Sequence, residues 1–114
     1  MDLHLASSVV KGVGVLSATG DIDVGTSVRL QPALWKLVDD HAGQVVVFDV
    51  RAVDSIDHLG IGVMVGALAR AVRHGGDLVV VCGPSRVLDI LTLSRLDRAI
   101  TIYPTVLDAA EAIL

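Results

Sequence analysis

Several residue types are scarce in this chain of 114 residues. Aromatic residues make up 3% of it, proline occurs three times, and cysteine occurs once, at position 82. A single cysteine excludes an internal disulfide, and the apolar run just before Cys82 predicts an unreactive thiol in the core. No apolar run reaches the roughly 18 residues that cross a bilayer, and no basic segment at the start precedes an apolar one. The sequence therefore predicts a cytoplasmic protein without membrane insertion.

Basic residues are few as well. Nine lysines and arginines face thirteen aspartates and glutamates, which gives a formal net charge of -4. Surfaces that hold phosphate backbones need a basic excess, so no nucleic acid partner is expected. Hydrophobic residues make up 53% of the chain, and most of them are aliphatic. This composition and length predict one domain, residues 1–114, built around a small and well-covered sheet.

The order of the apolar patterns predicts strands that alternate with helices. Residues 3–10 and 13–18 are expected to form a hairpin that turns at Lys11-Gly12. Further strands are expected at residues 44–50, 77–82 and 100–103, and helices at residues 30–41, 60–73, 84–93 and 105–114. The result is an α/β fold with a mixed sheet of about five strands and about four helices.

Residues 54–60 are the segment richest in reactive side chains. They are expected to join the central strand to the clearest helix, and they contain two aspartates, a serine and a histidine. Functional sites of α/β sheets gather where strands end and helices begin, because free N–H groups and the helix dipole point outward there. Aspartate and serine also commonly cap helices and satisfy turns, so the residues alone leave a structural role open.

Three kinds of catalytic or ligand site fail on spacing. Gly60-Ile61-Gly62 opens a helix, but a dinucleotide fingerprint needs glycine where this chain has Val65, and no Gly-Lys-Ser/Thr phosphate loop is present. The four histidines are scattered without metal-ligand spacing. A Ser-His-Asp hydrolase would need a Gly-x-Ser-x-Gly elbow, which is absent. We therefore expect no enzyme, no cofactor and no metal site, while weak nucleotide binding stays an alternative.

Short motifs along nearly the whole chain carry a resemblance to a known family. They lie, in order, at residues 20–23 (Gly-Asp-Ile-Asp), 45–50 (Val-Val-Val-Phe-Asp-Val), 56–63, 73–81, 96–98 and 103–105. Together they make the chain similar to the STAS domain, and in particular to anti-sigma factor antagonists. The resemblance implies a STAS-like single domain that binds an anti-sigma factor protein kinase. Such binding frees a sigma factor to regulate transcription, a form of bacterial signalling called partner switching.

The resemblance also singles out position 58. In these antagonists the loop normally reads Asp-Ser-Ser-Gly or Asp-Ser-Thr-Gly, and the anti-sigma factor phosphorylates the first hydroxyl residue. This chain has His58 at the matching position, so the usual phosphorylation is not expected, and Ser55 lies too early in the segment to replace it. Because the positive end of a helix dipole disfavours an imidazolium, we interpret His58 as a neutral contact residue. Phosphohistidine, a pH-responsive contact and a turn filler remain alternatives.

A partner-binding surface follows from the same resemblance. Asp23 and Asp57 match acidic positions near the phosphorylation site, although a helix cap explains Asp23 equally well. Trp35 is expected either at the edge of the core or as an interface anchor. A homodimer is left open, and the alternative function is a STAS module of a lipid transporter or of another signalling complex. The expected contact residues are Asp23, Asp57, His58, Leu59, Gly60, Ile61 and Met64.

Overall fold

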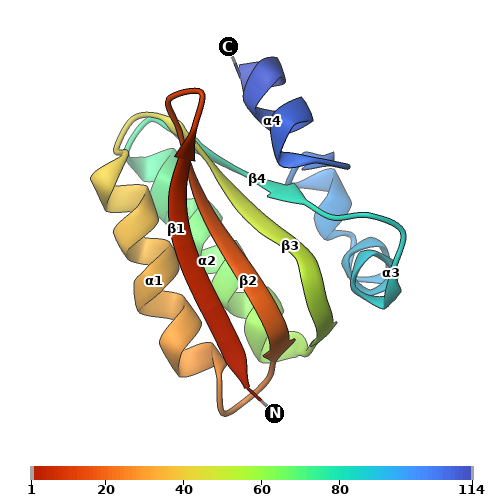
Figure 1. The fold of residues 1–114 in the computed structure, drawn as a ribbon. Helices are drawn as coiled ribbons and strands as arrows, with labels where there is room; N and C mark the ends of the chain where they lie inside the picture. The colour runs from red at the N-terminus through yellow and green to blue at the C-terminus, as the bar shows by residue number, and fades with distance from the viewer. Residues whose placement is uncertain (1, 114) are drawn as a thin grey trace.

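A five-stranded sheet with helices on both faces forms the centre of the molecule (Figure 1). The structure, a computed structural model, describes residues 2–113. Strand β1 pairs antiparallel with β2, and the remaining neighbours pair in parallel. The predicted mixed α/β fold is therefore confirmed. The strands, in spatial order, are β1 (Leu3–Val10), β2 (Val13–Ile22), β3 (Val45–Ile56), β4 (Asp77–Val81) and β5 (Ile102–Tyr103).

The helices divide the side chains of the sheet between two cores. Successive residues of a strand point to opposite faces. Phe48 therefore lies in the larger core, which α1 and α2 cover, while Val47 lies in the smaller core beneath α4. The α-helices are α1 (Ser27–Asp40), α2 (His58–Arg73), α3 (Arg86–Leu93) and α4 (Val106–Ile113), and a short 3₁₀ helix spans Leu96–Arg98.

The first turn has the geometry that its sequence predicts. Lys11 and Gly12 have φ angles of 51° and 80°. Two positive φ angles in a two-residue loop are typical of a type I′ turn, whose twist matches that of the flanking strands. The pairing of β1 with β2 runs without a break from Val10 opposite Val13 to Leu3 opposite Gly20.

Some predicted boundaries and positions are wrong. Helix α1 begins at Ser27, not near residue 30, because the carbonyl of Asp23 accepts the N–H of Ser27 (2.8 Å) and so sets its first turn before Pro32 is reached. Val72 continues the helical spacing of Ile61, Met64 and Leu68, yet it is 57% exposed, and Ala71 packs against the core in its place. The predicted helix end at Leu114 lies outside the described residues.

Two other predictions concern single residues. Cys82 is 4% exposed, and its burial raises the pKa of the thiol, so the predicted core position is confirmed. Trp35 is 36% exposed and lies at the surface between α1 and α2, where the guanidinium of Arg70 stacks 4.5 Å from the centre of its ring. Within residues 2–113, no helix combines the length and the apolar character needed to span a membrane.

Candidate functional site

The predicted site lies at the edge of the sheet where β2 and β3 end. The sequence predicts a loop over residues 54–60, but β3 continues through Ile56, because Ser55 and Ile56 pair with the last residues of β2. The N–H of Asp57 then donates to the carbonyl of Ile22 (3.0 Å). Asp57 is thus the single residue between β3 and α2, so the strand holds the start of the helix directly.

Asp57 caps helix α2. Its backbone is extended, and its Oδ1 accepts the N–H of Gly60 at 3.1 Å. A side chain at this position satisfies one of the N–H groups that have no partner inside the helix. The carboxylate is half-buried and already engaged by its own helix. Its expected part in partner binding stays a prediction.

Gly60 lets α2 approach the ends of both strands. A Cβ atom at this position would lie 2.5 Å from Cγ2 of Ile22 and 2.8 Å from Cγ1 of Ile56. Both isoleucines belong to the large core and are held in place by it. Gly60 itself is buried. Its expected role as a contact residue therefore does not fit the structure, in which it serves the packing of the helix.

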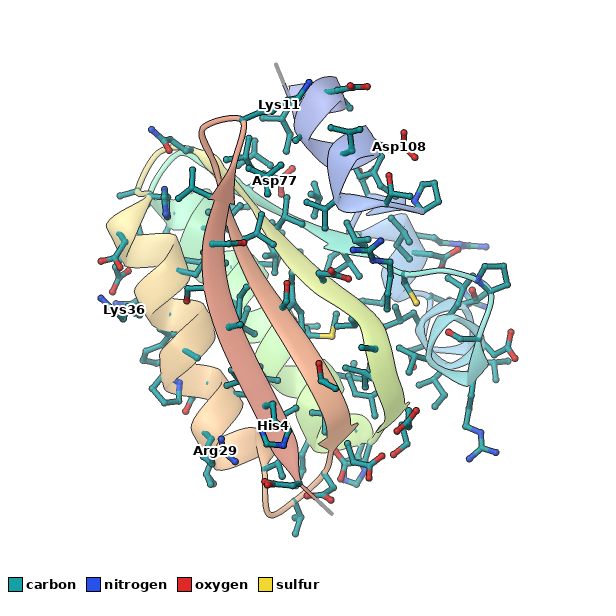
Figure 2. All side chains as sticks on the ribbon, viewed as in Figure 1. His4, Lys11, Arg29, Lys36, Asp77 and Asp108 are labelled. Atoms are coloured by element: carbon teal, nitrogen blue, oxygen red, sulfur yellow. The ribbon has the colours of Figure 1, made fainter. Side chains whose placement is uncertain are left out.

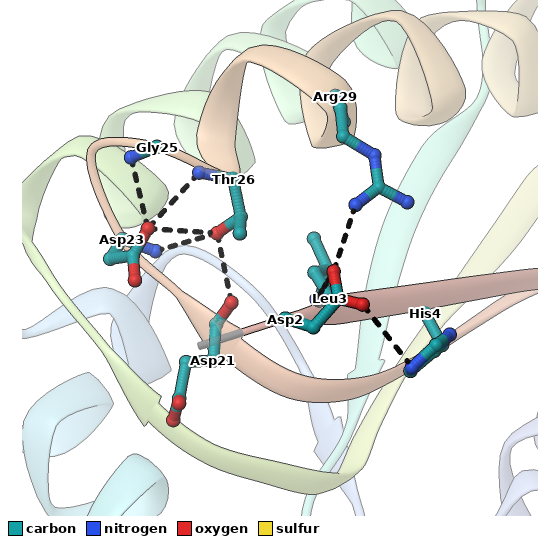
Figure 3. A network of polar contacts seen from close by, with 8 residues as sticks. All are labelled: Asp2, Leu3, His4, Asp21, Asp23, Gly25, Thr26 and Arg29. Atoms are coloured by element: carbon teal, nitrogen blue, oxygen red, sulfur yellow. Dashed lines mark hydrogen bonds and ion pairs between the residues drawn. The ribbon is translucent and has the colours of Figure 1, made fainter.

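Asp23 organises the turn before α1 (Figure 3). Its Oδ1 accepts the N–H of Thr26 (3.0 Å) and of Gly25 (2.9 Å), and these hydrogen bonds, first that of Thr26, hold the pKa of the carboxyl below its usual range. The hydroxyl of Thr26 donates in turn to the carbonyl of Asp21 (2.8 Å). The N-cap of α1 is Thr26, so Asp23 is not the helix cap that the sequence left open, and its carboxylate holds the preceding turn instead. The expected partner contact of Asp23 remains a prediction.

Ser55 is bound to a buried carboxylate. Its Oγ donates to Oδ1 of Asp21 at 2.8 Å, and Asp21 is 7% exposed. A phosphate on Ser55 would bring about two negative charges against this carboxylate, away from the helix start. That Ser55 does not replace the missing phosphoacceptor stays a prediction.

The outward side of α2 is apolar and unusually open. Leu59 is 40% and Val65 44% exposed. Gly62 and Gly66 lie on the same side, and a Cβ atom added to either would meet no atom within 4 Å. We call these four residues together with His58, which is exposed at the first position of the helix, the α2 surface.

Not all expected contact residues belong to the α2 surface. His58 and Leu59 do, and Ile61 is half-buried against the core. Met64 is 0% exposed, so its expected role as a contact residue is wrong, since its side chain packs between the helix and the sheet. Sequence reasoning missed Gly62 and Gly66. Two glycines four positions apart inside a helix were the signal that could have identified them.

The acids near the site are engaged within the chain. Among residues 2–113, no three side chains of histidine, cysteine, aspartate or glutamate are grouped in a way that would hold a metal ion. The carboxylates of Asp21, Asp23 and Asp57 accept hydrogen bonds from neighbouring residues. The exposed α2 surface begins directly after Asp57.

The comparisons with known proteins agree with one another. The family model of the STAS domain matches residues 4–109. A curated relative from Thermotoga maritima, named as an anti-sigma factor antagonist, is 36% identical over 61 residues, which are 54% of this chain and 54% of the relative. A relative named as its homolog, from Thermotoga neapolitana, matches equally well. The chain thus spans about half the length of the curated relatives it matches.

Solved structures extend the likeness to the whole fold. The crystal structure of an anti-sigma factor antagonist from Mycobacterium paratuberculosis has a TM-score of 0.89 and 26% sequence identity, and the match covers 98% of this chain and 94% of that one. The crystal structure of the antagonist from Thermotoga maritima has a TM-score of 0.85 at 23% identity, over 96% of this chain and 93% of the other. The second likeness shows the fold alone.

Proposed function

The chain belongs to the STAS domain family, and we propose that it is an anti-sigma factor antagonist. It binds an anti-sigma factor of the serine-kinase type in the cytoplasm and thereby frees a sigma factor. It acts by binding and not by catalysis. The names of its relatives and of the similar structure from Mycobacterium paratuberculosis support this role.

The α2 surface is the observation that carries the proposal. Glycine inside a helix costs roughly 0.5–1 kcal/mol relative to alanine. At Gly60 the packing of the fold explains the glycine, but at Gly62 and Gly66 a methyl group would meet no atom within 4 Å outside its own helix backbone in residues 2–113. A partner that lies close to the helix backbone accounts for both glycines, and the half-exposed Leu59 and Val65 beside them supply apolar contact area.

We further propose that binding lacks the usual off switch. His58 takes the first position of α2, where the phosphorylated hydroxyl stands in the family, and an imidazole offers the kinase no hydroxyl. Asp57 caps the helix without help from a phosphate. ATP should therefore leave the complex intact. A phosphate on His58 in the native protein would refute this part of the proposal.

Affinity capture with two matched variants tests the surface. Leu59 and Leu107 are each the second residue of their helices, α2 and α4, and are 40% and 49% exposed. Leu59→Gln and Leu107→Gln thus make the same chemical change at two similar places without altering the charge. Tagged wild-type protein and both variants are incubated with extract of the source cells, and bound proteins are identified by mass spectrometry.

The expected result is specific for one surface. Wild type and Leu107→Gln should recover an anti-sigma factor kinase, and Leu59→Gln should recover about tenfold less, which corresponds to a loss of about 1.4 kcal/mol in binding. Equal recovery of the kinase by both variants would contradict the proposal that the α2 surface binds it. Recovery of membrane-transporter subunits in place of a kinase would contradict the antagonist role itself.

A further inference from the structure

Trp35, the only tryptophan of the chain, lies on helix α1 and is 36% exposed. Its indole N–H forms no hydrogen bond within residues 2–113, where the ring instead stacks with Arg70. Tryptophan is enriched at protein interfaces, because its ring offers a large apolar area and its N–H a hydrogen bond. Single exposed apolar side chains are common, however, so the surroundings of the ring decide its role.

The ring of Trp35 is held in one orientation. The guanidinium of Arg70, from α2, lies 4.5 Å from the centre of the ring. Nε and Nη2 of Arg70 in turn donate to the two carboxylate oxygens of Asp39, at 2.8 and 2.9 Å. Trp35 and Asp39 are four residues apart on α1, so neighbouring side chains of one helix bind the guanidinium together. A side chain that is already fixed loses little conformational entropy when a partner covers it.

Arg70 connects this ring with the α2 surface. Gly62, Gly66 and Arg70 follow one another at intervals of four residues and form one row along α2. Helices α1 and α2 lie side by side on the same face of the sheet (Figure 1). Long helical side chains point back toward the start of their helix, so the guanidinium of Arg70 comes toward Gly66. A Cβ atom on Gly66 would nevertheless meet no atom within 4 Å, so the indole leaves the space above this glycine open.

A partner on the α2 surface therefore reaches Trp35. A stable interface buries about 800 Å² on each protein, which is a patch roughly 30 Å across. Successive members of the row Gly62, Gly66 and Arg70 are only about 6 Å apart along the helix. With the ring 4.5 Å from the guanidinium of Arg70, Trp35 falls well inside such a patch. Val28, two turns before Trp35 and 70% exposed, adds apolar area to the same side of α1.

Two ion pairs flank the ring and leave its contact chemistry apolar. Arg70 is paired with Asp39. Lys36, on the outer side of α1 in Figure 2, is paired with Asp40 at 2.9 Å. The surface that Trp35 itself offers is an aromatic ring with one hydrogen-bond donor. The matching group of a partner is an apolar side chain beside a hydrogen-bond acceptor.

We propose that Trp35 is a principal contact residue for the anti-sigma factor, so that the interface extends from α2 onto α1. This inference rests on the proposed function, because it assigns a second helix to the same partner. The partner places an apolar side chain against the ring and a carbonyl oxygen at the indole N–H. Arg70 and Asp39 are positioning residues that hold the ring. Residues that dominate binding energy are often tryptophans near the centre of an interface.

The single tryptophan permits a test without a substitution. The protein is labelled with fluorotryptophan, so that its fluorine NMR spectrum has one resonance, which comes from Trp35. Spectra are recorded with and without the purified anti-sigma factor, and a soluble gadolinium chelate measures how exposed the ring is. Calorimetry on the same samples measures binding. In the complex the resonance should shift, and the chelate should broaden it less than in the free protein.

The outcomes separate this inference from the proposed function. Binding that leaves both the resonance and its broadening by the chelate unchanged would overturn the role of Trp35, while the proposed function would stand. Absence of binding in the calorimeter would refute the proposed function and this inference with it.

Variants measure how much affinity the ring supplies. Trp35→Ala should raise the dissociation constant at least about thirtyfold, which corresponds to about 2 kcal/mol. Trp35→Phe keeps a ring beneath Arg70 and should raise it about tenfold, and it serves if circular dichroism shows that the alanine variant is misfolded. Leu93→Ala, at a leucine of α3 that is 83% exposed, is the control and should bind like wild type.

These variants also distinguish binding from a purely structural role at the contact of α1 with α2. A structural role alone would lower the free energy of unfolding and leave the affinity of the folded protein unchanged. A folded Trp35 variant that binds the anti-sigma factor as tightly as wild type would therefore refute the proposal.

Discussion

The glycines of α2 yield a sharp prediction, because Gly60 and Gly62 lie two residues apart in one helix and have opposite surroundings. Gly60→Ala would place its methyl group 2.5 Å from Cγ2 of Ile22 and 2.8 Å from Cγ1 of Ile56. Ile22 is 1% and Ile56 5% exposed, so neither side chain has room to move away. Gly62→Ala meets nothing within 4 Å.

The magnitudes follow from these surroundings. Overpacking of a core costs about 1–3 kcal/mol, and alanine recovers up to about 1 kcal/mol through its higher helix propensity. Gly60→Ala should therefore lower the free energy of unfolding by about 1–2 kcal/mol. Gly62→Ala should raise it by about 0.5–1 kcal/mol, since only the propensity changes. The two variants should differ by roughly 2 kcal/mol, or about 8 °C in melting temperature for a domain of this size.

Urea unfolding followed by circular dichroism measures both changes, and an unaltered slope shows that the unfolded state is the same. If Gly60→Ala proved as stable as wild type, the close packing of α2 on Ile22 and Ile56 would be refuted. The same proteins also test the proposed interface. Gly62→Ala should bind the anti-sigma factor more weakly despite its greater stability, whereas unchanged binding would show that no partner lies close to this position.

Three further predictions concern other residues. Met64→Ala should lower the free energy of unfolding by about 2–5 kcal/mol, because the side chain is wholly buried, while Val65→Ala on the neighbouring exposed side should change it by about 0.5 kcal/mol or less. The side-chain hydrogen bond from Arg70 lowers the pKa of the Asp39 carboxyl below its ordinary value of 3.8. Wild type should therefore be more stable than Asp39→Asn above pH 3.8 and should lose this advantage as the pH falls through the lowered pKa of the folded state. Melting curves of both proteins at a series of pH values measure the difference. Cys82 should react with an aromatic disulfide reagent far more slowly in the native protein than in urea, and equal rates would contradict the burial that raises the pKa of its thiol.

The order of the elements could be predicted because each strand and helix has a local pattern. The alternation before and after Lys11-Gly12 predicts the hairpin, and the apolar run from Val45 predicts β3. The end of β3 could not be predicted in the same way. Asp54 and Ser55 are typical of loops, but β2 continues beside this part of β3, where Val53, Ser55 and Ile56 pair with its last residues and Asp54 lies at a shift in register. Such long-range pairing leaves no local signal.

The candidate site could be predicted in position but not in detail. The resemblance placed it at the start of α2, where the structure has Asp57, His58 and Leu59 together. It did not separate exposed from buried positions. Met64 turns inward because α2 packs with its small residues, among them Ala67 and Ala71, against the sheet, and this contact depends on the whole fold. Spacing along one helix does not define which side faces the sheet.

The most direct test of the proposed function is the dissociation constant of the purified anti-sigma factor for this protein, measured before and after incubation with Mg²⁺ and ATP. We expect the same constant in both cases and an unmodified mass for the wild type. His58→Ser, which returns a hydroxyl to the first position of α2, should gain a phosphate and lose affinity. Wild-type protein that acquires a phosphate and dissociates from the anti-sigma factor on addition of ATP would contradict the central claim. That claim is that His58 prevents the phosphorylation by which the kinase would end binding.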